Sequence, residues 1–189
     1  MSDYGLTRLL GGVIQYKTAE TGAAASPSGL IVMDHDHHEI HEGNHHFVSV
    51  STAAASATDV LAVVLTSPAT KLMNYTAEFS GSGAIIATIV ENPTVAATSK
   101  VALVEYNNNR SSTKVAAMIA VKISSTDVSG GTTLQKIVLG GGQQGRTGGN
   151  AGDRNELMFK QSEDYAILIE SNAASNNISY TGSWYEESS

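Results

Sequence analysis

The chain alternates apolar and polar residues over much of its length, in short runs separated by glycine, asparagine, serine and proline. Successive side chains of a β-strand point to opposite faces, so a two-residue period predicts strands with one buried face. In the clearest run, residues 114–123, one face is expected to hold Val115, Ala117, Ile119, Val121 and Ile123, and the other Lys114, Ala116, Met118, Ala120 and Lys122. Strands are predicted over residues 30–33, 46–51, 60–65, 71–79, 84–90, 101–106, 114–123, 134–139, 157–160, 165–170 and 178–185.

The order of these strands, with turn-forming residues between them and no helical stretch, predicts an all-β protein. We expect a jelly-roll-like antiparallel β-sandwich with an N-terminal extended arm, the sandwich occupying residues 29–189. In its last strand Ile178, Tyr180 and Trp184 share a face, and the only tryptophan of the chain is expected to close the core.

Residues 1–28 differ from the rest, because an apolar stretch broken by glycines is followed by a small, polar connector. We predict an N-terminal arm that extends over a neighbouring molecule, with a disordered tail as the alternative. The residues expected to make that contact are Tyr4, Leu6, Leu9, Leu10, Val13 and Ile14.

The charge balance and the lack of cysteine exclude several classes of partner. The 189 residues include 18 acidic and 11 basic side chains, for a net charge of −7, which argues against nucleic-acid and anionic-membrane binding. There is no cysteine for disulfides or thiolate metal sites, and no apolar run near 18 residues. The N-terminus is not expected to be a signal peptide, so the protein is expected to work where it is made or in a particle assembled there.

All six histidines lie between residues 35 and 46, and His41 to His45 formally matches the zinc-protease pattern H-E-x-x-H. That chemistry requires a helix, whereas Gly43 and Asn44 favour a turn and a strand follows them. In an extended chain residues four apart are separated by roughly 13 Å, too far to hold one ion. We therefore predict no metal site and place the histidines, His37, His38 and His41 among them, at a loop or subunit interface. A metal shared between subunits is the alternative.

No catalytic constellation is predicted elsewhere. Residues 140–149 formally match G-x-G-x-x-G and nearly match a phosphate-binding loop with Arg146 in place of lysine, but no helix can follow them. We expect a long flexible surface loop there. No serine lies in a G-x-S-x-G elbow, and no carboxylates show the spacing of a catalytic pair. The protein is expected not to be an enzyme and to use no cofactor.

Three consecutive asparagines, residues 107–109, predict a turn before Arg110, because asparagine tolerates left-handed backbone and bonds its own main chain. Arg110 is expected to join Arg154 and Glu156 in an ion-pair network at a loop end or subunit boundary, with solvated loop charges as the alternative. Asn109, Arg110, Arg154 and Glu156 thus complete the predicted interface.

Several motifs taken in order resemble a family of small virion proteins of tailed phages. The resemblance spans about residues 30–187. The motifs that carry it are His37-His38-Glu39-Ile40-His41-Glu42-Gly43 followed by an aromatic-led strand at Phe47, Glu105-Tyr106-Asn107-Asn108-Asn109-Arg110-Ser111-Ser112, the glycine-rich residues 140–149, Arg154-Asn155-Glu156-Leu157-Met158-Phe159-Lys160-Gln161, Tyr165 at the start of a strand, and Trp184-Tyr185-Glu186. The chain departs from the family at Asn108, where arginine is more usual, and the spacing at Asn109 to Ser111 is shifted by one.

The resemblance implies a capsid decoration or cement protein without catalytic activity. It would be a homotrimer that binds the major capsid protein on the outer surface of the head, in a virion assembled in the host cytoplasm. Two other hypotheses stay open. One is a receptor- or glycan-binding virion appendage that uses Tyr4, Tyr16 or Tyr106 for sugar stacking. The other is a cupin-type metal enzyme, although the chain lacks the downstream histidine of that ligand set.

Overall fold

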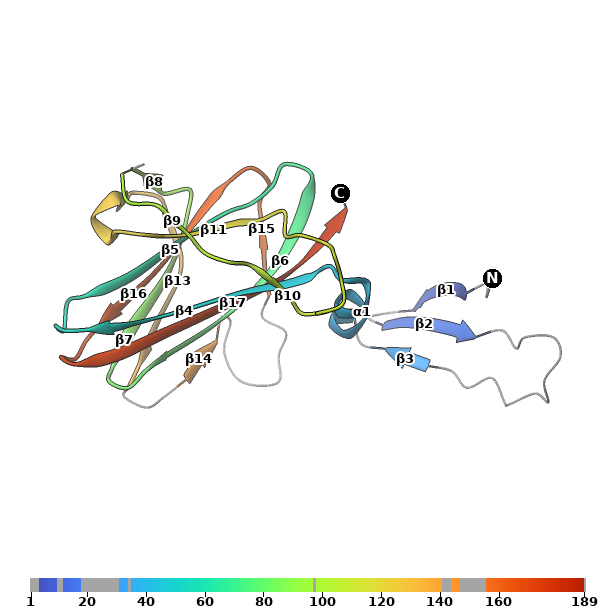
Figure 1. Ribbon diagram of the computed structural model, residues 1–189, viewed down its shortest axis with the longest axis horizontal. Helices are drawn as coiled ribbons and strands as arrows, with labels where there is room; N and C mark the ends of the chain where they lie inside the picture. Colours follow the sequence, from blue (N-terminus) through green and yellow to red (C-terminus); the bar gives the residue numbers. More distant parts are fainter. Residues whose placement is uncertain are drawn as a thin grey trace.

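The protein folds as a sandwich of two six-stranded antiparallel sheets, preceded by a helix and a small N-terminal sheet (Figure 1). The structure is a computed structural model and describes residues 4–9, 12–17, 31–33, 35–96, 98–140, 144–146 and 156–188. The first sheet contains β10 (Tyr106–Asn107), β4 (His45–Ala54), β17 (Asn176–Ser188), β6 (Lys71–Gly81), β14 (Gln144–Arg146) and β15 (Leu157–Phe159), of which the last two both pair with β6. The second contains β13 (Thr132–Leu139), β7 (Ile85–Glu91), β16 (Asp164–Ser171), β5 (Val60–Thr66), β11 (Ile119–Ile123) and β9 (Val101–Ala102).

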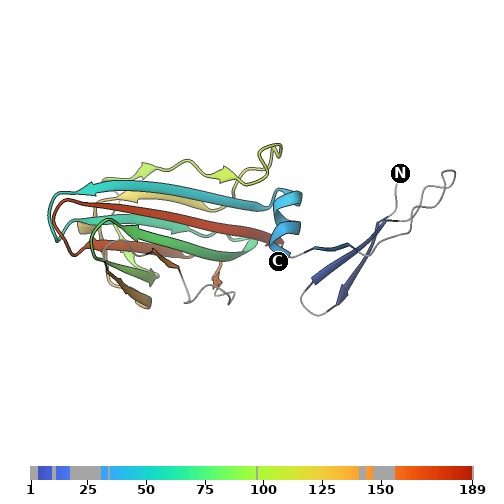
Figure 2. The same cartoon turned by 90° about the horizontal axis from the view of Figure 1, so that it is seen from below.

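The strand order is that of a jelly roll, which confirms the predicted fold class. Each step along the chain from β4 through β5 and β6 to β7 crosses from one sheet to the other. The last two strands then return between the first four: β16 pairs with both β5 and β7, and β17 pairs with both β4 and β6. The long strands of the first sheet lie side by side in Figure 2.

The N-terminal residues form a separate three-stranded antiparallel sheet. It consists of β1 (Tyr4–Leu9), β2 (Gly12–Lys17) and β3 (Ile31–Met33), in that order. The strand expected at residues 30–33 therefore pairs with β2 and not with the sandwich. Helix α1 (His35–Glu42) lies between this sheet and β4 (Figures 1 and 2). This helix contradicts the expectation that the chain has no helical stretch.

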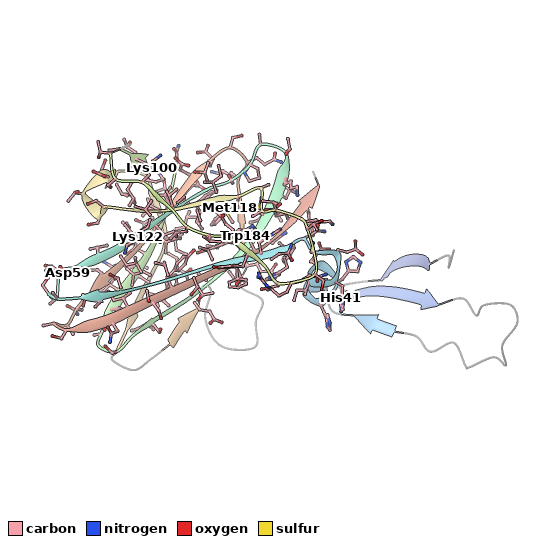
Figure 3. All side chains as sticks on the ribbon, viewed as in Figure 1. His41, Asp59, Lys100, Met118, Lys122 and Trp184 are labelled. Carbon is pink, nitrogen blue, oxygen red and sulfur yellow. The ribbon has the colours of Figure 1, made fainter. Side chains whose placement is uncertain are left out.

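The run at residues 114–123 differs from its prediction in two respects. Only β11, its second half, is a strand, and burial does not follow one face: Met118 and Ala120 are buried, and so is Ile123 on the opposite face, whereas Val115 is 84% and Ile119 is 59% exposed. Met118 lies inside the sandwich, close to Trp184 (Figure 3). Both faces of this run carry apolar residues, so its period alone left the buried face undetermined. The glycine-rich segment also differs from a plain loop, because β14 pairs with β6.

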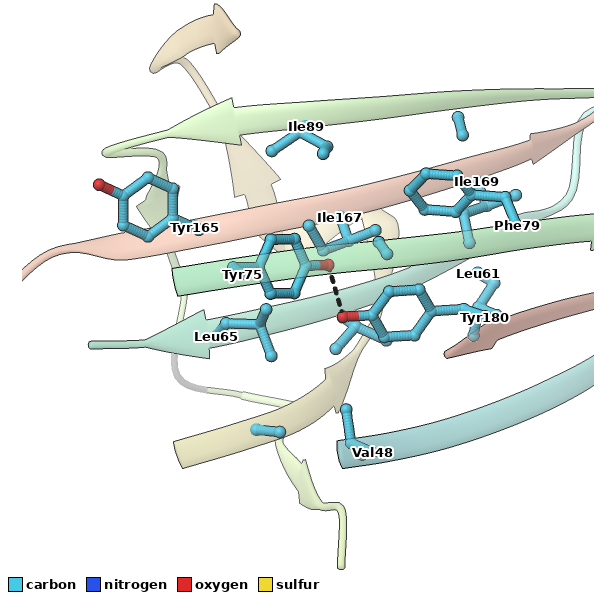
Figure 4. Close-up of a cluster of buried hydrophobic side chains, with 14 of the residues drawn as sticks. Val48, Leu61, Leu65, Tyr75, Phe79, Ile89, Tyr165, Ile167, Ile169 and Tyr180 are labelled. Carbon is cyan, nitrogen blue, oxygen red and sulfur yellow. Dashed lines mark hydrogen bonds between the residues drawn. The ribbon is translucent and has the colours of Figure 1, made fainter. Parts of the chain in front are cut away.

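The core between the sheets is rich in aromatic side chains, among them Tyr75, Phe79 and Tyr180 (Figure 4). The predicted burial of Trp184 is confirmed. Phe159 and Tyr165 stack with ring centroids 3.7 Å apart, and the hydroxyls of Tyr75 and Tyr180 are hydrogen-bonded at 2.8 Å. Burial raises the pKa of both Tyr75 and Tyr180, and raises that of Tyr165 to about 12, so all three hydroxyls remain protonated and neutral.

A second, smaller apolar cluster covers the outer face of β5 and its neighbours. Residues that alternate with the main core along β5, Ala62 and Val64, pack there with Val90, Ile123 and Ala166. Val95 and Val128, from the two-stranded sheet of β8 (Thr94–Val95) and β12 (Val128–Ser129), lie against this cluster. The 3-10 helix η1 (Ser125–Asp127) immediately precedes β12. The second sheet is therefore covered on both faces at its centre.

Candidate functional site

Helix α1 ends in a Schellman motif that the sequence specifies at Gly43. Gly43 has φ +74°, a left-handed conformation that glycine adopts without a Cβ penalty. Its N–H donates to Ile40 O at 3.0 Å, and the N–H of Asn44 donates to Glu39 O at 2.9 Å. The side chains of the same turn also pair, because Asn44 Nδ2 donates to the buried Glu39 carboxylate at 2.8 Å. The helix thus stops one residue before the turn that leads into β4.

Asn107, which lies 64 residues after Gly43 in the sequence, holds this helix end to the sandwich. Its side chain is buried, and Nδ2 donates to Gly43 O at 2.7 Å and to Lys114 O at 3.2 Å. Its Oδ1 accepts the N–H of Asn109 at 2.8 Å, which closes the turn expected from the consecutive asparagines. A Cβ at Gly43 would overlap Ser112 Oγ, so the loop and the helix end are in close contact.

The neighbouring loop residues add further hydrogen bonds to the same place. Asn109 Nδ2 donates to His41 O at 3.0 Å, and Lys114 Nζ donates to Asn44 Oδ1 at 2.9 Å. Asn108 contacts His45 twice, through its N–H to His45 O at 2.9 Å and between Nδ2 and the ring Nδ1 at 2.6 Å. Carbonyls at a helix C-terminus lack partners inside the helix, and these side chains supply them. We call this contact between α1 and residues 106–114 the helix–loop junction.

The five histidines whose side chains are described, His37, His38, His41, His45 and His46, do not converge on one point. His37 and His41 are exposed on one side of α1 and stack with centroids 4.7 Å apart and an interplanar angle of 12°, whereas His38 lies 3.1 Å from Glu39. His45 stacks on Tyr185 and the buried His46 stacks on Trp184. Within the described residues, no group of three or more His, Cys, Asp or Glu side chains could hold a metal ion.

The expectation of an extended chain through the histidines is wrong for residues 35–42, which are helical, and right from His45 onward. It failed because an eight-residue helix with one aliphatic side chain has almost no hydrophobic period to detect. The helix ends at Glu42 and His45 begins β4, so His41 and His45 do not share the helical face that H-E-x-x-H chemistry requires.

Beneath the junction, Glu186 is a fully buried carboxylate with four donors. It accepts hydrogen bonds from Lys71 Nζ at 2.8 Å and Trp184 Nε1 at 3.2 Å, and from the N–H groups of Ala117 at 2.6 Å and Met118 at 3.3 Å. Burial works to raise the pKa of Glu186, but the hydrogen bonds, that of Lys71 foremost, outweigh it and lower the pKa below its ordinary value.

His46 lies in the same environment. Burial, the largest influence, lowers its pKa, and the charges of Lys71 and His45 act in the same direction, against the carboxylates of Glu186 and Glu105. His46 is therefore a neutral packing residue on Trp184 at neutral pH.

The other predicted interface residues are placed as follows. The Arg110 guanidinium lies 5.4 Å from the centroid of the Tyr106 ring, which in turn packs on Phe47. Glu156 accepts a hydrogen bond from Tyr185 Oη at 2.7 Å. Arg154 and Leu10 lie outside the described residues, and for Tyr4, Leu6, Leu9, Val13 and Ile14 only the backbone is described.

A polar groove lies at the opposite end of the sandwich, beside the β4–β5 turn, with a volume of about 390 Å³. Its carboxylate, Asp59, accepts hydrogen bonds from Ser56 N, Ser56 Oγ and Ala55 N, and the bonds from Ser56 foremost lower its pKa. The acceptor positions of this carboxylate are therefore used to close the turn. Asp59 and Lys122 are labelled at this end in Figure 3.

The sequence did not predict the side chains that make most of the hydrogen bonds between α1, residues 106–114 and the sandwich. These are Glu39, Asn44, Asn107, Lys114 and Glu186. A pattern for the helix end was present, since Gly43-Asn44 is a common helix stop. The hydrogen bonds of Asn107 with Gly43 and of Glu186 with Ala117 connect residues more than sixty positions apart, and no local sequence pattern predicts them.

The chain has a low similarity to solved viral structures. No protein-family model matches it, and no curated protein matches it. It is similar to a chain from the Gt strain of infectious bursal disease virus, with 14% identity over 97% of this chain and 52% of that chain and a TM-score of 0.17. A mutant VP2 protein of the same virus is 13% identical over 96% of this chain and 47% of that chain, with a TM-score of 0.16. The chain spans about half the length of these chains, and at such TM-scores the likeness carries no argument.

Proposed function

We propose that the protein is a virion component that decorates and stabilises a phage capsid, bound as a homotrimer to the major capsid protein on the outer head surface. The observation that carries the proposal is the helix–loop junction. Two motifs that underlie the resemblance to small phage virion proteins, residues 37–43 and 107–112, are separated in sequence but hydrogen-bonded to each other in the fold. A shared structural task explains why both belong to one pattern.

We infer that this task is to anchor α1, the element that follows the N-terminal sheet along the chain, to the rigid sandwich. A decoration protein must transmit force between capsid subunits, which requires a stiff domain and a firmly attached contact element. The jelly roll supplies the first through its continuous aromatic core. The junction supplies the second, because α1 directly follows β3 and is bonded to the sandwich at its C-terminus. Many symmetric copies, each burying roughly 1,000 Å² or more, would then reinforce a shell.

Capsid binding by the isolated protein tests this proposal. Heads assembled without the protein are incubated with the full chain or with a chain that lacks residues 1–33, and bound protein is measured by co-sedimentation. We expect saturable binding of the full chain, a higher melting temperature of the loaded heads, and loss of binding by the shortened chain. The shortened chain should retain the thermal unfolding transition of the sandwich, because every strand of the two sandwich sheets, with the two core clusters between and over them, comes from residues 45–188. Equal loading by both chains would refute the role of the N-terminal sheet.

A receptor- or glycan-binding appendage remains the second candidate, because Tyr106 is 41% exposed next to Phe47. The Arg110 guanidinium already lies over the Tyr106 ring, where a sugar would have to stack. A glycan array separates the two functions: binding by the full chain that disappears in Tyr106→Ala would favour the appendage.

A further inference from the structure

The stacked pair His37 and His41 has the spacing of a two-histidine metal site. On an α-helix, side chains four positions apart lie one turn above each other, with Cβ atoms about 5–6 Å apart. Zinc-binding helices bring two imidazoles to one ion by this spacing. Residues 35–42 are helical, so the wide separation of residues four apart in an extended chain does not apply to His37 and His41.

The geometry of the rings suits shared coordination of one ion. Two imidazole nitrogens that are each about 2 Å from a metal are themselves separated by about 3–4 Å. The centroids of the His37 and His41 rings are 4.7 Å apart and the planes differ by 12°. A rotation about χ2, a broad torsion in histidine, brings nitrogen atoms of the two rings to that separation without moving the helix. Both side chains are exposed, so an ion reaches them from solvent.

The backbone under His41 is fixed before any ion arrives. His41 O accepts a hydrogen bond from Asn109 Nδ2 at 3.0 Å, and the next turn is closed by Gly43 and the buried Asn107. A ligand pair on a rigid element loses little conformational freedom on binding, which favours affinity. His38, by contrast, is directed to Glu39.

We propose that His37 and His41 bind one divalent transition-metal ion of the kind that imidazole prefers, Cu²⁺, Ni²⁺ or Zn²⁺. The described residues contain no third His, Cys, Asp or Glu within a shared group, so the protein supplies two ligands and solvent fills the remaining positions. The site discriminates by ligand type: imidazole favours copper, nickel and zinc, whereas Ca²⁺ and Mg²⁺ prefer oxygen ligands. The affinities should follow the order Cu²⁺ above Ni²⁺ and Zn²⁺.

Isothermal titration of the full chain, prepared without a histidine tag, measures the binding of each metal chloride separately. We expect one equivalent of Cu²⁺ or Ni²⁺ at pH 7.5 and no heat from Ca²⁺. His37→Ala and His41→Ala should each weaken binding by about tenfold or more, since the loss of even a supporting residue costs a metal site that much. Electron paramagnetic resonance of the Cu²⁺ complex should show two nitrogen ligands in the native chain and one in either variant.

The matched control is His38→Ala, which removes a histidine from the same helix but leaves the stacked pair. It should retain the native affinity and the two-nitrogen spectrum. Because all three substitutions are on the surface or edge of α1 and alanine favours helices, circular dichroism should show folded protein in each case. Absence of binding by the native chain would overturn the proposal. So would an equal loss in His38→Ala, which would indicate diffuse binding by the histidine-rich segment.

Discussion

Removal of the Glu186 carboxylate should be among the most destabilising single changes in the protein. In Glu186→Ala the N–H groups of Ala117 and Met118 and the indole N–H of Trp184 lose their acceptor in a place that water does not reach. Each buried donor left unsatisfied costs about 1–3 kcal/mol, and disruption of a buried ion pair typically costs about 3–5 kcal/mol. Lys71 is partly exposed and can turn to solvent, so we expect a loss near the middle of that range, about 4 kcal/mol.

Urea unfolding measures this loss directly. With a slope of about 2 kcal/mol per molar, a 4 kcal/mol loss lowers the midpoint by about 2 M. Glu186→Gln keeps the shape and one acceptor oxygen and should lose about 2 kcal/mol, since only the charge-assisted part is removed. The matched control is Glu170→Ala on the exposed side of β16, expected within about 0.5 kcal/mol of the native chain. Amide exchange at Ala117 and Met118 should accelerate in Glu186→Ala. A loss no greater than that of the control would refute the assignment of Glu186 as a buried acceptor.

Three further changes test neighbouring features. The free energy of unfolding should fall from pH 7 to pH 4. Folding lowers the pKa of His46, so its contribution to stability is complete above pH 6.5, its unfolded pKa, and is lost as the pH falls below that value. Folding also lowers the pKa of Glu186, which adds a further loss of stability below pH 4.5, the pKa of the unfolded side chain. Urea titrations at several pH values would show this, and a flat profile would contradict it. Gly182→Ala places a Cβ against Tyr180 Oη and should cost about 1–3 kcal/mol in thermal unfolding. Asn107→Ala removes three hydrogen bonds and should cost about 2–3 kcal/mol, with amide shifts confined to the helix–loop junction in nuclear magnetic resonance spectra.

The strands of the sandwich were predictable because their side chains alternate between buried and exposed with a period of two residues. Along β17, Ile178, Tyr180 and Trp184 alternate with exposed or half-exposed residues, and the two-residue period identified both the strand and its buried face. The same rule failed at residues 114–118, where apolar residues lie on both faces. There the outcome is decided by Glu186, which binds the amides of Ala117 and Met118 from a strand 69 and 68 positions away.

The candidate site was predictable only in part, for a related reason. The composition singled out the histidines and the asparagines as two unusual segments, and the structure brings them together. The contact between the histidine segment and the asparagine segment depends on the pairing of β10 with β4, which are far apart in the sequence. The helix itself was missed because its stability is not local: eight residues with a single aliphatic side chain do not form a stable helix in water.

Helix α1 is held in place mainly by hydrogen bonds, because it buries very little apolar surface. Ile40 is its one aliphatic side chain and is only partly buried, so hydrophobic packing alone cannot fix its orientation. The Schellman turn and the side-chain amides of Asn107 and Asn109 fix the orientation of α1, because each hydrogen bond constrains both distance and angle. The attachment of α1 to the sandwich and the alignment of the stacked imidazoles therefore depend on the same few contacts, and both can change while the aromatic core stays intact.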